Sequence, residues 1–126
     1  MMVAGIGSRK GVSARDVLAA VETALEAHGL ALPALSALAT ASLKQDEAAI
    51  FAAGRELRLP VIVVEQDELK AASTTSRSDL SHEHAGTPSV SEASALAAAG
   101  KGAKLLGPRT VLGAVTCAIA ISGDAA

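Results

Sequence analysis

Aromatic side chains are almost absent from this chain of 126 residues. Phe51 is its one phenylalanine, and tryptophan and tyrosine do not occur. Sites that stack nucleobases or sugars on aromatic rings are therefore not expected. Charge of one sign is also missing, since 11 basic and 13 acidic residues give a net charge of −2. Nucleic-acid-binding domains carry a basic surface, so we expect a small molecule or a protein as partner and no nucleic acid.

Cysteine and long apolar runs are equally scarce. Cys117 is the single cysteine, which excludes an internal disulfide. It lies in the apolar run 115–121, and this position predicts a buried strand residue rather than a nucleophile. No apolar run approaches the roughly 20 residues of a membrane span. The first residues lack the basic and apolar regions of a signal peptide, so we expect a cytoplasmic protein without membrane contact.

Apolar residues make up half of the chain, enough for the core of one domain over residues 1–126. Strands are predicted at residues 2–6, 35–40, 61–64, 104–106 and 115–121. Helices are predicted after Ser13, near Asp46 and after Ser89, with a short one over 66–72. This alternation predicts the α/β class, as a three-layer α/β/α sandwich with a mostly parallel, mixed sheet. The run 61–64 is the clearest candidate for a buried strand.

Local signals define the first two helices. Ser13 is a suitable N-cap, Asp16 favours the positive end of the helix dipole, and Gly29 is placed to end the helix. The inner face of the second helix is predicted to comprise Ile50, Phe51, Gly54 and Leu57.

A glycine-bearing segment follows the first predicted strand and leads into the first helix. Such a segment presents unpaired N–H groups and a positive dipole end to an anion. Its glycine spacing is one residue longer than the dinucleotide fingerprint, and no carboxylate ends the second strand. Arg9 and Lys10 favour an anion site, while a turn that merely needs glycine and a nicotinamide site stay as alternatives. The predicted binding residues are Gly5, Gly7, Ser8, Arg9, Lys10 and Gly11.

A second glycine-bearing segment, residues 86–96, leads into the Ala-rich helix. Ser89 and Glu92 have the spacing of a capping box. Glu92 also has a second interpretation, as an acid or base at the edge of a binding loop. The residues predicted to bind a ligand here are Gly86, Thr87, Ser89, Val90 and Glu92.

Polar residues follow the second predicted strand. Thr40, Lys44 and Glu47 should share a crevice with the first glycine segment, because ligands bind at the carboxyl ends of strands in α/β sheets. The alternative for Lys44 and Glu47 is a surface ion pair of little energetic value.

The segment 71–88 is rich in serine and threonine and is predicted to be a long loop. Ser76 and Arg77 could clamp a carboxylate there, or belong to a solvated loop. His82 and His84 form a His-x-His pair, but a metal site would need further ligands. We therefore predict no metal and no cofactor.

In their order along the chain, these segments resemble the family that comprises CobE and the C-terminal domain of CbiG, proteins of cobalamin (vitamin B12) biosynthesis. The resemblance is carried by residues 5–11, by 38–40 with Lys44 and Glu47 following, by 86–96 and by 116–120. The length of the chain resembles the free-standing CobE branch. Ser8 departs from the pattern, because many relatives have cysteine at this position, so a thiol-dependent step there would be lost.

The resemblance implies a ligand and a pathway. Precorrin intermediates carry acetate and propionate side chains, and the basic residues near the glycine segments would suit such charge. We expect a precorrin-binding or accessory protein, with other enzymes of the pathway as possible partners. One alternative is hydrolysis of a ring lactone with release of a two-carbon fragment, with Glu92 or Glu47 as general base. A phosphate- or nucleotide-binding module is the other alternative.

Overall fold

The computed structural model describes residues 1–8, 11–41, 48–65, 67, 90–100, 102–107 and 109–122. Their strands are β1 (Met2–Ser8), β2 (Ala37–Ala41), β3 (Val61–Val64), β4 (Lys104–Leu105), β5 (Thr110–Leu112) and β6 (Val115–Ile121). Their helices are α1 (Ala14–Ala27), α2 (Ala48–Leu57) and α4 (Val90–Ala99), with a 3₁₀ turn over Leu32–Ala34. None of these helices is both long enough and apolar enough to cross a membrane.

The described strands form one mixed sheet in the order β3-β2-β1-β6-β4, and β5 pairs with β6 beside β4. β1 pairs in parallel with β2, and β2 in parallel with β3. β6 is antiparallel to β1, β4 and β5, so it runs against the other described strands. The predicted α/β class with a mostly parallel, mixed sheet is confirmed.

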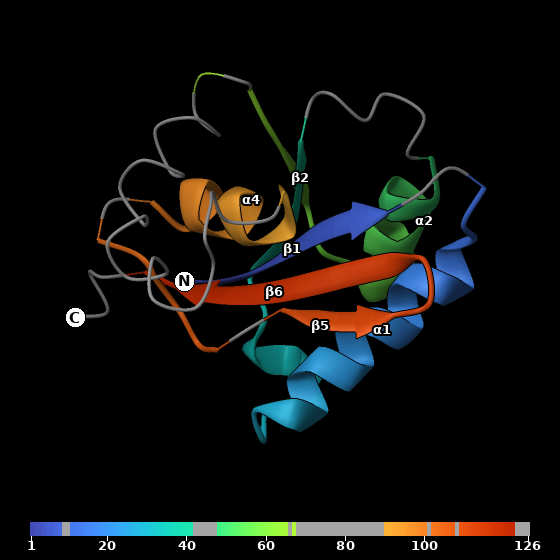
Figure 1. Ribbon diagram of the computed structural model, residues 1–126, viewed down its shortest axis with the longest axis horizontal. Helices are drawn as coiled ribbons and strands as arrows, with labels where there is room; N and C mark the ends of the chain where they lie inside the picture. Colours follow the sequence, from blue (N-terminus) through green and yellow to red (C-terminus); the bar gives the residue numbers. More distant parts are fainter. Residues whose placement is uncertain are drawn as a thin grey trace.

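Helices cover both faces of this sheet (Figure 1). α1 and α2 pack on one face, where they meet Ile6, Leu38 and Ile119 in the larger apolar cluster. α4 packs on the other face over β1, β6 and β2, in a cluster that includes Val3 and Ala39. Because side chains alternate along a strand, neighbouring residues of β1 and β2 belong to different clusters. The predicted three-layer arrangement is therefore present.

The ends of α1 follow the local signals in the sequence. The Ser13 N–H donates to Asp16 Oδ2 at 3.0 Å, and the Asp16 N–H donates to Ser13 Oγ at 3.2 Å. This reciprocal pair is a capping box. Beyond the helix, Gly29 has a φ of +67°, a left-handed conformation that glycine adopts without strain. Both predicted helix limits are confirmed.

Three expectations about packing and strands need correction. Phe51 is 38 % exposed and does not belong to the inner face of α2, where Ile50, Ala53 and Gly54 are buried. Only Val64 is buried in β3, because this strand ends the described sheet and has a neighbour on one side only. The structure also adds β5, a strand over residues that were predicted to form only a turn and connection.

Candidate functional site

The sheet divides the predicted binding residues between its two faces. Ser8 continues the alternation of Ile6, and Thr40 that of Leu38, so both belong to the α1/α2 side. Gly5 and Gly7 have the opposite orientation and belong to the α4 side. β1 extends through both glycines to Ser8, so the predicted strand end at residue 6 was too early. The four positions lie in neighbouring parallel strands, but they do not form one cluster.

Gly5 is the point at which α4 approaches the sheet. A Cβ atom at this position would lie 2.7 Å from the Ala95 backbone nitrogen and would also clash with the backbone oxygen of Ser91. The absence of a side chain therefore allows the backbone of α4 to pack directly on β1. Helix packing explains this glycine, and its predicted contact with a ligand stays a prediction.

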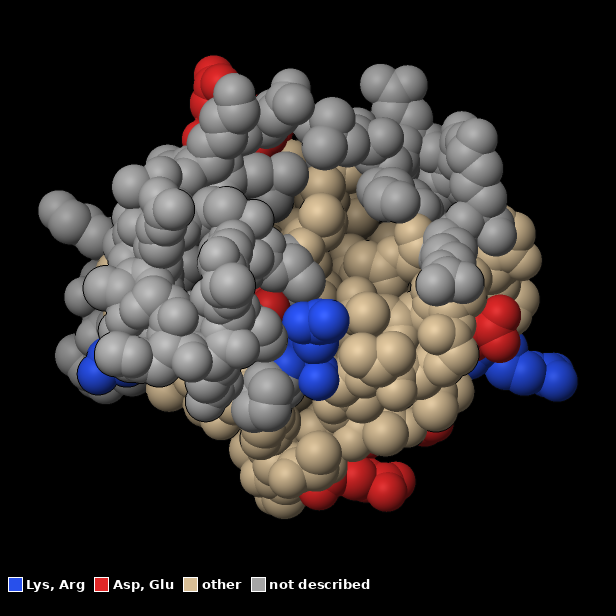
Figure 2. Space-filling view, in the orientation of Figure 1, with Lys and Arg blue, Asp and Glu red and all other residues tan. Residues whose placement is uncertain are grey.

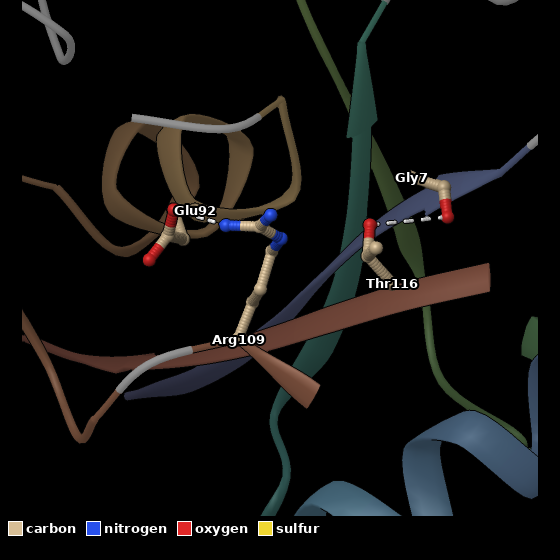
Figure 3. Close-up of polar contacts among 4 residues, drawn as sticks. All are labelled: Gly7, Glu92, Arg109 and Thr116. Atoms are coloured by element: carbon tan, nitrogen blue, oxygen red, sulfur yellow. Dashed lines mark hydrogen bonds and ion pairs between the residues drawn. The ribbon is translucent and has the colours of Figure 1, made fainter. Parts of the chain in front are cut away.

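Gly7 lies next to Thr116, its partner residue on β6. The Thr116 hydroxyl donates to the carbonyl oxygen of Gly7 at 3.3 Å (Figure 3). A Cβ atom at Gly7 would lie 2.8 Å from that hydroxyl and 3.7 Å from the Ser91 backbone nitrogen. The carboxyl half of β1 thus presents backbone and a hydroxyl, rather than apolar side chains, toward the first turn of α4.

A buried carboxylate lies in the first turn of α4. Glu92 is 1 % exposed, and its Oε1 is 3.8 Å from Nη1 of Arg109 (Figure 3). The Arg109 side chain is 35 % exposed, so the ion pair links a buried carboxylate to a cation that reaches the surface. Burial of a carboxylate is costly without a partner, and Arg109 supplies the opposite charge.

The register of the edge strands explains how Arg109 reaches α4. Leu105 pairs with Ala120, and Thr110 pairs with Cys117. The register of β5 against β6 is therefore shifted by two positions from that of β4. Thr110 shares the α1/α2 side of Cys117, so Arg109, one position earlier, is directed to the α4 side.

Two hydroxyl groups are buried without a hydrogen-bond partner in the described structure. These groups are Thr40 Oγ1 on β2 and Ser94 Oγ on α4. Thr40 is 1 % exposed, and Ser94 is fully buried. Buried polar groups in native proteins are nearly always hydrogen-bonded, so both are candidates for contact with a ligand or an ordered water.

The surface on this side carries little charge in its described part (Figure 2). Figure 2 shows a hollow in which the described residues are uncharged, with Lys or Arg atoms beside it. Such a surface suits a ligand with an extended apolar body and charged groups at its periphery.

Other predicted site residues are either placed apart or lie outside the described ranges. Gly11 is exposed, with a φ of +84° that favours glycine, and Val90 is the 37 % exposed first residue of α4. The positions outside the described residues are Arg9, Lys10, Lys44, Glu47, Ser76, Arg77, His82, His84, Gly86, Thr87 and Ser89. The capping box of Ser89 and Glu92 and the short helix over 66–72 stay predictions for the same reason.

Comparisons with known proteins show which family the chain belongs to. The family model described as Cobalamin synthesis G C-terminus matches residues 2–120. The chain belongs to this family. A curated relative, Protein CobE of a Sinorhizobium species, is 29 % identical over 121 residues, which are 94 % of this chain and 79 % of the relative.

Solved structures of family members share the fold. The crystal structure of cobalamin biosynthesis protein chiG from Agrobacterium tumefaciens has a TM-score of 0.84 at 46 % identity, covering 98 % of this chain and all of that one. The crystal structure of CobE, a protein from the cobalamin biosynthetic pathway, has a TM-score of 0.80 at 34 % identity. That match covers 95 % of this chain and 89 % of CobE.

Cys117 behaves in this family member as the sequence predicts. The thiol is buried on the α1/α2 side of β6, and burial raises its pKa to about 12. A thiol that stays protonated is a poor nucleophile and a poor metal ligand. Within the described residues, no group of three His, Cys, Asp or Glu side chains could hold a metal ion.

Arg109 and Thr116 are candidate site residues that sequence reasoning missed. Arg109 follows a Gly-Pro pair and precedes β5, so it has the sequence context of an ordinary turn. A signal was available in the alternation of β6, where Thr116 interrupts a run of apolar residues. That interruption marks a polar position on an otherwise apolar central strand.

Proposed function

We propose that this member of the CobE/CbiG C-terminal family binds a precorrin intermediate of cobalamin biosynthesis on the α4 side of the sheet, as a binding or accessory protein. The observation that carries the proposal is Arg109, a partly exposed cation held by buried Glu92 beside a described surface with few charged residues. A large ring with peripheral carboxylates has the matching chemistry, an extended body and several negative groups.

The residues around Arg109 support a ring ligand in a specific way. Thr116 presents a hydroxyl beside Gly7 at the carboxyl half of β1. Gly5, Ala39 and Ala41 are covered by α4, so a ligand on this side would contact the first turn of α4 and the carboxyl ends of the strands rather than the covered backbone. The N-terminal end of α4 adds a partial positive charge that favours carboxylates.

Binding accounts for these residues better than hydrolysis does. A hydrolase site needs a nucleophile or positioned water, a base and a group that orients the base. Glu92 instead faces a cation, and the Cys117 thiol is buried on the other face of the sheet. We therefore propose a carrier or accessory role in the cytoplasm, with the pathway enzymes that make or use the precorrin as partners.

The test is to mix the purified protein with a set of precorrin intermediates and separate the mixture by gel filtration. The absorption spectrum and mass of the ring are recorded in both the protein fraction and the unbound fraction. We expect one coloured intermediate to co-elute unchanged. Loss of a two-carbon fragment or gain of water would instead make the protein a lactone hydrolase. No co-elution and no mass change in either fraction would contradict the proposal.

A further inference from the structure

We propose that Arg109 is the residue that binds a carboxylate of the ligand, and that Glu92 is a positioning residue that holds its guanidinium at the surface. This inference rests on the proposed function and names the chemical group that the site selects. It assigns the selection of carboxylate over carboxamide to one side chain of the described structure.

Arg109 has more donors than the described structure uses. A guanidinium presents five N–H donors in a planar fork. Nη1 is 3.8 Å from Glu92 Oε1, and Nε is buried without a hydrogen-bond acceptor. A buried donor without an acceptor costs free energy. A ligand carboxylate could recover this cost if the fork turned toward it and offered two parallel N–H groups.

The Arg109–Glu92 ion pair is longer than a bidentate arginine–carboxylate pair. Bidentate Arg–carboxylate pairs have N–O distances of about 2.7–2.9 Å, whereas the separation here is 3.8 Å. At this distance Glu92 attracts the guanidinium without saturating its donors. Glu92 is almost completely buried and Arg109 is about one-third exposed, so the pair orients the cation from below and leaves it open to the surface.

The chain places Arg109 by a local irregularity rather than by a regular strand. The register of β5 against β6 is shifted by two positions from that of β4. A change of register redirects the side chains that follow it, as a bulge does. Gly107 fits the same arrangement, because a Cβ atom there would lie 2.9 Å from Cε1 of His28 at the end of α1. Both features hold the segment that carries Arg109 against the body of the molecule.

The site that follows has three parts on the α4 side. Arg109 provides a full positive charge, the first turn of α4 provides a partial one, and Thr116 provides a hydroxyl beside Gly7 (Figure 3). In register, Arg109 stands two strands from Gly5, which is about 10 Å at the usual strand spacing. A ligand that touches both Arg109 and the carboxyl half of β1 must therefore be broad, as a tetrapyrrole is.

The test compares two corrin rings that differ only in their peripheral groups. One ring carries free carboxylates, and the other carries carboxamides at the same positions. We expect the wild-type protein to bind the carboxylate ring more tightly. Arg109→Gln should weaken binding of the carboxylate ring by about tenfold to a hundredfold, as expected for loss of a charge-assisted hydrogen-bond pair. Its affinity for the carboxamide ring should change less than about threefold.

Two further variants separate recognition from folding. Arg109→Gln leaves Glu92 buried without this cation, and the protein could lose stability for that reason. The double variant Arg109→Gln/Glu92→Gln removes both charges and should unfold at a temperature near that of the wild type. We expect it to remain unable to prefer the carboxylate ring. Arg55→Gln on α2 removes a cation elsewhere and should keep the wild-type preference.

The outcomes distinguish this inference from the proposed function. If the wild-type protein binds neither ring, the proposed function fails, and the assignment of Arg109 fails with it. If the wild type binds both rings and the folded double variant keeps the preference for carboxylates, the assignment of Arg109 alone is wrong. Restoration of that preference in the double variant would make the Arg109–Glu92 pair purely structural.

Discussion

The two faces of the sheet are packed by different kinds of side chain. On the α1/α2 side, Ile6, Leu38 and Ile119 bury large aliphatic groups against α1 and α2. On the α4 side, the same strands present Gly5, Ala39 and other small residues. The first face provides apolar burial, and the second allows a close approach of backbone to backbone. If the proposed function is correct, stability and ligand binding are assigned to opposite sides of one sheet.

The polar groups follow the same division. Glu92, Ser94 and Arg109 lie on the side of the small residues, where α4 is buried over six consecutive residues from Ser91 to Leu96. Large aliphatic side chains would fill the space that these groups occupy. The α4 face buries fewer large aliphatic groups, so its structure depends on close packing of backbone against backbone. Substitutions on the two faces should therefore have different consequences.

The largest expected effect is on the aliphatic face. Leu38→Ala should lower the free energy of unfolding by about 2–5 kcal/mol, because it removes a fully buried side chain and leaves a cavity. Urea denaturation measures this loss. Val63→Ala is the control, since Val63 is 42 % exposed on edge strand β3, and it should cost less than about 1 kcal/mol. Folded Leu38→Ala should retain its affinity for the ring, and a large loss of affinity would contradict the division of roles.

A smaller but more specific effect is expected on the α4 face. Gly5→Ala should destabilise the protein by about 2–3 kcal/mol, because the added methyl group meets backbone atoms of α4 that can move only with the helix. It should also weaken ring binding. The control is Gly113→Ala, at a φ of +61° with open space around it, which should cost about 1 kcal/mol and leave binding unchanged. Equal effects of the two alanines would show that close packing at Gly5 is unimportant.

The smallest effect concerns the buried thiol on the aliphatic face. The pKa of Cys117 is raised from 9.0 to about 12 by desolvation, so the folded state holds the proton more tightly than the unfolded state does. The resulting stability is present below pH 9 and is lost as pH rises from 9 toward 12, by about 1.4 kcal/mol per pH unit. Comparison of wild type with Cys117→Ala by urea denaturation at pH 8 and pH 10 isolates this loss. A parallel decline of both proteins would contradict it.

Local signals in the sequence predicted much of the fold. The capping residues Ser13 and Asp16, the stop at Gly29 and the apolar run of β6 depend on near neighbours, and each was identified correctly. The exposure of Phe51 and Val63 depends instead on which strand ends the sheet. That order is set by pairings between distant residues, which no local pattern reports.

The candidate site was less accessible to sequence reasoning for the same physical cause. Thr40, Gly7 and Glu92 were predicted as site residues from their positions near a predicted strand end or helix start. Arg109 was missed because its approach to Glu92 depends on a two-position shift between the registers of β4 and β5 against β6. Arg109 also lies 17 positions after Glu92 in the chain, too far for a local pattern to join them. Periodicity predicts which face of a strand is buried, but it does not predict a change of register that redirects one side chain.

The pairing of β1 with β6 has a consequence for how the chain assembles. Met2 pairs with Ile121, and the Ser122 N–H donates to the carbonyl oxygen of Met1 at 2.8 Å. The β1–β6 pairing thus joins residues from opposite ends of the described chain. Forming it costs the entropy of closing a very long loop. During synthesis, β1 is made well before β6, and until β6 is made β2 is the only described strand that can pair with β1. The strand at the middle of the described sheet therefore lacks its β6 neighbour until the last described strand has been made.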